Sequence, residues 1–173
     1  MSKLSLALFI VFATLRLITL AISVKNERQL RQSGAEEYDP LNTKILAALH
    51  ALFYLAALAE GWLKGVQFDG VALTGAIIYL LAMAVLFYII RVLSPIWTVK
   101  LYIAKGHTLN KSWLFSHVRH PNYFLNIIPE LIGLALVLKA YWVLLTIFPL
   151  YLISLALRIV REEKIMRATF SDY

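Results

Sequence analysis

The chain has 173 residues, of which 61% are hydrophobic and 16% are charged. A soluble domain is roughly half apolar and about a quarter charged, so this composition excludes an ordinary soluble protein and indicates an integral membrane protein. The formal net charge is +7, and we expect membrane lipid rather than nucleic acid as the partner of this excess. The absence of cysteine excludes disulfides, thiolate nucleophiles and cysteine-bound metals.

Five apolar segments have a length suited to crossing a bilayer, or close to it. They cover residues 4–24, 43–63, 71–93, 123–138 and 140–157. Only Lys139 separates the last two, which predicts a tight helical hairpin. At ~1.5 Å per residue the first helix of this hairpin is about 24 Å long, slightly short for a hydrocarbon core of ~30 Å. We therefore predict an all-α integral membrane bundle with about five transmembrane helices.

The segments between the spans are polar. Residues 25–42 are predicted to form a loop. Ser94-Pro95 has the pattern of a helix cap followed by proline, and apolar residues at helical spacing continue to Gly106, which predicts a short interfacial helix. Residues 158–169 are predicted to continue the last span as a cytosolic helix. We expect one membrane domain, with a three-helix part (1–93) and a cofactor-binding and catalytic part (94–173).

Basic residues predict the orientation in the membrane. They are concentrated in the loops 25–44 and 91–122 and in the tail, whereas the opposite side has only Lys3, Lys64 and Lys139. The positive-inside rule then places the N-terminus outside and the C-terminus in the cytoplasm.

A polar stretch at the start of the fourth span is the best indication of function. It reads Arg119-His120-Pro121-Asn122-Tyr123, and we call these residues, 119–123, the elbow. Proline suits the first position of a helix, so we predict that the free N–H groups of Asn122 and Tyr123 meet a polar ligand. A structural alternative is a helix-start turn whose charges bind headgroups.

A second polar stretch, Arg158-Ile159-Val160-Arg161-Glu162-Glu163, follows the last span. The predicted topology puts it on the same side of the membrane as the elbow, and the functional interpretation depends on the two meeting. The alternative is a plain surface ion pair between Arg158 and Glu162, although arginine before glutamate is the less favourable order in a helix.

Together these residues resemble the isoprenylcysteine carboxyl methyltransferase family, in its short bacterial-type branch. The resemblance covers most of the chain and is strongest from residue 94 onward. The residues that carry it are Lys25-Asn26-Glu27-Arg28, Gly34-Ala35-Glu36, Trp97-Thr98, Gly106-His107-Thr108-Leu109, Arg119-His120-Pro121-Asn122-Tyr123, Glu130, Arg158-Ile159 and Glu162-Glu163. The chain departs from the family pattern at Trp113-Leu114-Phe115, where the family usually has Gly-Pro-Tyr.

The resemblance implies a helical membrane bundle that binds S-adenosylmethionine at its cytosolic face and transfers a methyl group to a carboxylate or hydroxyl of a lipophilic substrate. It implies Arg158 and Glu162 as catalytic residues, and no metal. The residues that it implies for cofactor binding are His107, Leu109, His117, Val118, Arg119, His120, Pro121, Tyr123, Asn126, Glu130 and Glu163.

Methyl transfer requires mainly the alignment of nucleophile, methyl carbon and leaving sulfur, with water excluded. A carboxylate acceptor, with a pKa of ~3.5, is ionised at neutral pH and needs a cation such as Arg158 to orient it. A phenol, with a pKa of ~10, needs a base, for which Glu162 or a histidine is the candidate. Prenylated cysteine, an alkylated phenol or pyrone, and another lipid acid all remain open as acceptors.

Four further ionisable residues lie at or within the predicted spans, where such groups usually face a bundle interior or water. We expect structural pairing or snorkelling for Arg16, His50 and Glu60, and either a cofactor-pocket or a structural role for Glu130. Two other functions remain open. One is an NADPH-dependent membrane reductase, and the other is a small transporter that would show paired or broken helices near the midplane.

Overall fold

A computed structural model describes residues 1–103 and 113–169 of the chain. The helices and strands follow in the order α1 (Lys3–Gln32), β1 (Glu36–Tyr38), α2 (Pro40–Leu63), α3 (Gly70–Leu93), β2 (Leu101–Ile103), α4 (Trp113–His117), the π-helix η1 (Asn122–Ile127), α5 (Ile128–Leu138) and α6 (Tyr141–Thr169). The predicted all-α bundle is confirmed, apart from one short pair of strands.

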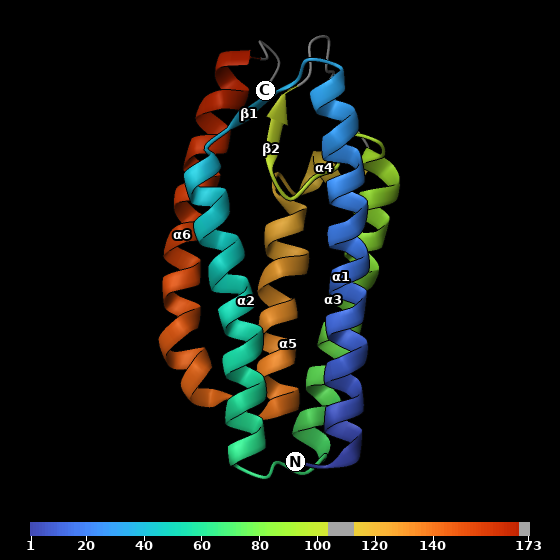
Figure 1. Cartoon of the computed structure of the whole chain (residues 1–173), viewed down its shortest axis with the longest axis vertical. Helices are drawn as coiled ribbons and strands as arrows, with labels where there is room; N and C mark the ends of the chain where they lie inside the picture. The colour runs from blue at the N-terminus through green and yellow to red at the C-terminus, as the bar shows by residue number, and fades with distance from the viewer. Residues whose placement is uncertain (104–112, 170–173) are drawn as a thin grey trace.

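The long helices run side by side along the molecule, and α5 lies among them (Figure 1). In the part of the chain that the structure describes, four helices, α1, α2, α3 and α6, are long and apolar enough to cross a membrane. The helix formed by η1 and α5, Asn122–Leu138, is apolar but shorter. Its Leu131, Leu134 and Val137 have no exposed surface. The short fifth helix is therefore the centre of the core, and the lengths agree with the prediction from the sequence.

The closest helix packing joins α3 to α5 at two glycines. A Cβ atom built on Gly75 would lie 2.6 Å from the carbonyl oxygen of Gly133, and one built on Gly133 would lie 2.7 Å from that of Gly75. Small residues let membrane helices approach until their backbones touch. The two glycines thus fix how α5, and with it the elbow, sits against α3.

The predicted hairpin is confirmed, because α5 ends at Leu138 and α6 starts at Tyr141. Lys139 makes the turn in the left-handed region, with φ of 49°. The predicted helical continuation of the last span is confirmed too, since α6 extends to Thr169.

The predicted polar loop 25–42 is wrong in its first part, because α1 continues to Gln32. Asn26 and Leu30 face the protein and are buried, while Glu27 and Arg31 pair one turn apart at 2.8 Å. The polar residues therefore continue the helix beyond its apolar part.

The predicted interfacial helix after Ser94-Pro95 is also wrong. Residues 94–100 form a turn and irregular backbone, and Leu101–Ile103 pairs antiparallel with β1, so that Tyr38 lies opposite Leu101. The end of α1 holds this segment, since Asn26 Nδ2 donates to the Trp97 carbonyl at 2.8 Å. The aromatic and β-branched residues of β2 suit a strand. Pairing with β1, which lies far away in the sequence, makes this segment a strand and not a helix.

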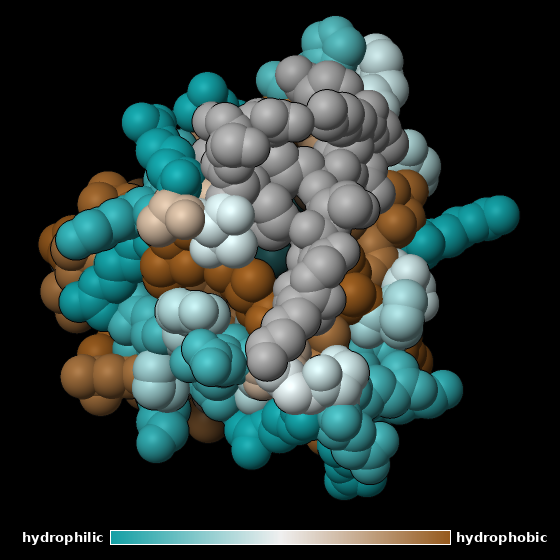
Figure 2. Space-filling model, turned by 90° about the horizontal axis from the view of Figure 1, so that it is seen from above, coloured by the Kyte–Doolittle hydropathy of each residue, from teal (hydrophilic) through white to brown (hydrophobic). Residues whose placement is uncertain are grey.

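The strands, the elbow and the last turns of α6 share one end of the bundle, which we call the charged end (Figure 1). Figure 2 shows this end from above, with hydrophilic side chains around much of its rim. A network of Glu27, Arg31, Glu37, Lys100 and Tyr102 ties α1 to both strands there. The opposite end contains the N-terminus and the turn at Lys139, whose ammonium lies 2.6 Å from Asp69.

Candidate active site at the charged end

The elbow follows α4, and its last two residues, Asn122 and Tyr123, begin the π-helix η1. Pro121 has helical dihedral angles, φ −63° and ψ −31°, as expected for proline at a helix start. The N–H groups of Tyr123 and Phe124 both donate to the His120 carbonyl, at 3.0 and 3.2 Å. The prediction that the Tyr123 amide is free for a ligand is therefore wrong, because the elbow uses that amide to close its own turn. That the Asn122 amide is free to meet a ligand stays a prediction.

The structure brings the elbow and the second polar stretch together. His120 Nδ1 lies 3.7 Å from Glu162 Oε1, and His120 Nε2 lies 3.4 Å from Glu163 Oε1. The Tyr123 hydroxyl donates to Glu162 Oε2, and the rings of His120 and Tyr123 stack. Arg119 Nη1 is 4.0 Å from Glu163. Two carboxylates of α6 thus face the histidine and the tyrosine of the elbow.

Arg158 completes this group from inside the bundle. Its exposed fraction is 3%, and its Nη1 donates to Thr43 Oγ1 at 2.8 Å. Its Nε lies 3.9 Å from Glu162 Oε2. A plain surface ion pair between Arg158 and Glu162 is therefore wrong, because the guanidinium is buried. The arrangement presents a buried cation beside a carboxylate, which suits the recognition of an acidic or polar head group.

The two glutamates change the acidity of His120. Burial lowers its pKa, but hydrogen bonding and charge interaction with Glu162 and Glu163 outweigh that effect, so its pKa lies above the ordinary value. The stabilisation from the charged imidazole is complete below the unfolded pKa of ~6.5 and is lost as the pH rises through the higher folded pKa.

This gives a pH-dependent prediction. We expect the wild type to be more stable than His120→Gln at about pH 5.5, and expect this difference to shrink as the pH rises toward about 9. Thermal unfolding of both proteins across this range measures it. His117→Gln is the control, because His117 is exposed and contacts the backbone of its own helix at Trp113. A difference for His120→Gln that stayed constant with pH would contradict the charged pairing.

The other predicted cofactor residues lie in different places. His117 and Val118 are next to the elbow, and Asn126 is fully buried one turn below it, donating from Nδ2 to the Ala82 carbonyl at 3.1 Å. Asn126 Oδ1 has no hydrogen-bond partner within the described residues. His107 and Leu109 lie outside the described residues.

Glu130 lies deeper, in the middle of the bundle, and its carboxylate joins a second cluster. It has no exposed surface, and its Oε1 is 3.3 Å from both Arg16 Nε and His50 Nε2. The Tyr54 hydroxyl donates to the same oxygen at 2.6 Å. The structural pairing predicted for Arg16 and His50 is confirmed. Tyr54 could not be named from the sequence, because nothing in the sequence shows which helices face one another.

Glu60 is paired at the opposite end, as predicted. Its carboxylate accepts from Lys64 and from the N–H groups of Trp142 and Val143, both at 3.0 Å. Glu60 therefore caps the start of α6 and lies away from the charged end.

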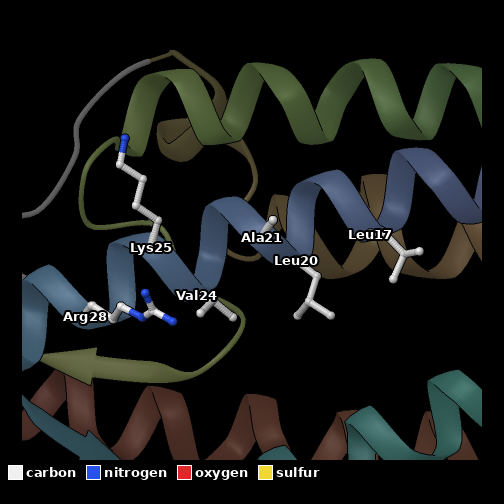
Figure 3. A pocket seen from close by; sticks show the side chains of 6 residues that line it. All are labelled: Leu17, Leu20, Ala21, Val24, Lys25 and Arg28. Atoms are coloured by element: carbon white, nitrogen blue, oxygen red, sulfur yellow. The ribbon is translucent and has the colours of Figure 1, made fainter.

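A shallow pocket on α1 has a different character. It is lined by Leu17, Leu20, Ala21, Val24, Lys25 and Arg28. Figure 3 shows Leu17, Leu20, Val24 and Arg28 pointing to the side of α1 on which α2 and α6 are drawn. An apolar stripe thus ends in basic side chains toward the charged end.

These features define a multi-pass helical membrane protein whose polar site lies where its helices end. The family model for the isoprenylcysteine carboxyl methyltransferase (ICMT) family matches residues 75–168, and the chain belongs to that family. The match includes the elbow and the site residues of α6. The protein is thus a membrane methyltransferase.

Two relatives extend the similarity to nearly the whole chain. An uncharacterized protein of Haemophilus influenzae is 44% identical over 162 residues, which cover 94% of each chain. The uncharacterized protein YpbQ of Bacillus subtilis is 27% identical over 153 residues, which cover 88% of this chain and 90% of that one. No solved structure matches the chain.

Proposed function

We propose that the protein transfers the methyl group of S-adenosylmethionine to an oxygen of a lipophilic acceptor, a carboxylate or a hydroxyl, at the cytoplasmic face of the membrane. The observation that supports this most is the buried Arg158 next to Glu162, facing the elbow of a family methyltransferase. The basic loops favour a cytoplasmic site and C-terminus, with the N-terminus outside.

The residues around the elbow suit the cofactor, which supplies a methyl group on a positively charged sulfur. Arg119 offers a cation for its carboxylate, and Glu163 offers an acceptor for its ammonium group. The buried side-chain oxygens of Asn122 and Asn126 have no hydrogen-bond partner among residues 1–103 and 113–169, and they suit hydroxyl or amine donors, since buried acceptors in proteins are normally hydrogen-bonded. His120 and Tyr123 offer stacked rings beside them.

Arg158 and Glu162 have different tasks for the two kinds of acceptor. In both, the acceptor oxygen forms the new bond to the methyl carbon while the carbon–sulfur bond breaks. A carboxylate brings no proton, and Arg158 orients it. A hydroxyl loses its proton, which Glu162 takes as the general base.

The acceptor's apolar part is expected to lie within reach of lipid. The stripe of Leu17, Leu20 and Val24 on α1 suits an apolar chain, and Arg28 at its end suits an acidic head. Prenylated cysteine, an alkylated phenol or pyrone, and other lipid acids share these two properties.

Ligand-induced stabilisation tests the cofactor. We expect S-adenosylmethionine and its demethylated product to raise the melting temperature of the detergent-purified protein, and to do so much less for His120→Ala and Arg119→Ala. At about 100 times its dissociation constant a ligand adds about 2.7 kcal/mol of stability. Stabilisation by NADPH, with none by S-adenosylmethionine, would instead favour the reductase.

Membership of a methyltransferase family weighs against both the reductase and the transporter. The cluster around Glu130 is a paired arrangement inside the bundle of the kind a transporter would have. Its carboxylate, however, already has Arg16 of the same chain as counter-ion.

A further inference from the structure

Thr43, in the first turn of α2, is the residue that holds the Arg158 guanidinium. Arg158 Nη1 donates to Thr43 Oγ1 at 2.8 Å, and the exposed fractions of the two residues are 3% and 6%. The Thr43 hydroxyl donates its own proton to the Asp39 carbonyl at 3.2 Å. That second bond directs the oxygen lone pairs away from Asp39, so the hydroxyl acts as a fixed acceptor for Arg158.

The bond to Thr43 fixes Arg158 more closely than its acidic neighbour does. The distance from Arg158 Nε to Glu162 Oε2 is 3.9 Å, which is beyond hydrogen-bond length. A guanidinium carries five N–H donors in a rigid plane, so one short bond to Nη1 sets the direction of the others. The direction in which Arg158 meets a ligand therefore depends on Thr43.

Two neighbouring contacts of the same turn bind α6 without touching the guanidinium. Ser154 Oγ donates to Asn42 Oδ1 at 2.8 Å, and Arg161 Nη1 donates to Asp39 Oδ1. Ser154, Arg158 and Arg161 are spaced along one face of α6. The first turn of α2 thus holds α6 at three levels, of which only the middle one involves the guanidinium of Arg158.

We propose that Thr43 is a positioning residue for methyl transfer, which aims the Arg158 guanidinium at the acceptor oxygen. The proposal rests on the proposed function and extends the site to α2, which lies before the residues matched by the family model. Loss of the hydroxyl should misalign Arg158 and weaken the reaction with the acceptor, while cofactor binding at the elbow persists.

Thr43→Val tests the proposal, because valine keeps the shape and removes the hydroxyl. The assay follows methyl transfer from S-adenosylmethionine to an S-farnesylated cysteine derivative, a long-chain alkylphenol and a long-chain fatty acid. We expect kcat/KM for the acceptor to fall roughly 10- to 100-fold, the usual effect of losing a hydrogen bond to a charged group. Stabilisation by S-adenosylmethionine should persist, and Thr43→Ser should restore most of the activity.

Asn42→Ala is the matched control, because Asn42 holds α6 through Ser154 and does not contact the guanidinium in the hydrogen bonds described. It should lower the melting temperature but leave kcat/KM near that of the wild type. An equal loss of kcat/KM in Asn42→Ala would show that Thr43 acts only through stability. If Thr43→Val fails to fold, the comparison of Thr43→Ala with Thr43→Ser replaces it.

The remaining outcomes separate the two proposals. Wild-type kinetics in Thr43→Val would overturn the role of Thr43 and leave the proposed function intact. A wild type that S-adenosylmethionine does not stabilise would overturn the proposed function itself. A wild type that binds S-adenosylmethionine but methylates none of the three acceptors would overturn the proposed acceptor class, and the role of Thr43 with it.

Discussion

Glu130→Leu is expected to lower the free energy of unfolding by about 3–5 kcal/mol, the usual cost of removing one partner of a buried ion pair. The carboxylate has no exposed surface, and its Oε1 is the acceptor for Tyr54 as well as the counter-ion of Arg16. Without it, the Arg16 guanidinium loses its counter-ion inside a membrane bundle and keeps only neutral polar partners such as His50, to which its Nε donates among the described residues.

The double variant Arg16→Leu with Glu130→Leu shows whether the charge is the cause. Replacing a whole buried pair with apolar residues is often neutral, so the double variant should be more stable than Glu130→Leu alone. Unfolding in mixed detergent micelles measures all three proteins. Arg167→Met is the control, because its i,i+4 pair with Glu163 is largely exposed and worth at most about 0.5 kcal/mol. A loss of unfolding free energy in Glu130→Leu as small as that in Arg167→Met would contradict the buried pair.

Much of the fold could be predicted from the sequence because a membrane imposes a simple rule. Every backbone polar group in the bilayer must be hydrogen-bonded internally, so each apolar run of sufficient length becomes a helix. The hairpin at Lys139 followed from the same rule, because two helices separated by a single residue can both cross the membrane only as an antiparallel pair. The ends of the helices were harder to predict. The extension of α1 and the strand at Leu101–Ile103 depend on contacts between segments far apart in the chain.

The site could be predicted in part for a similar reason. The charge pattern put the elbow and the α6 stretch on one side of the membrane, and His120 indeed lies beside Glu162 and Glu163. Helical spacing placed Glu130 below the elbow on the same helix. It could not show that Arg16 of α1 reaches this carboxylate, because the choice of neighbouring helix is set by packing. Thr43 was missed because nothing in the sequence marks a threonine near the start of a helix as the partner of a distant arginine.

Gly75→Ala and Gly133→Ala are each expected to lower the free energy of unfolding by about 3 kcal/mol, the upper end of the usual cost of overpacking. The added methyl group would lie 2.6 Å from a backbone oxygen in Gly75→Ala and 2.7 Å in Gly133→Ala. Backbone atoms of a helix cannot turn away as a flexible side chain can, so α3 and α5 must separate. This separation would open the core at its most closely packed point.

Gly70→Ala is the control for both, because a Cβ atom on Gly70 would meet no atom of the described part of the chain within 4 Å. It should be neutral or stabilise α3 by up to about 1 kcal/mol, since alanine is the better helix former. If Gly75→Ala behaved like Gly70→Ala in detergent unfolding, the close approach of α3 and α5 would be contradicted.

The double variant of Gly75 and Gly133 adds a sharper test. The two methyl groups clash at one crossing, so helices already separated by the first methyl group have room for the second. The double variant should therefore lower the free energy of unfolding by clearly less than the sum of the losses in the two single variants.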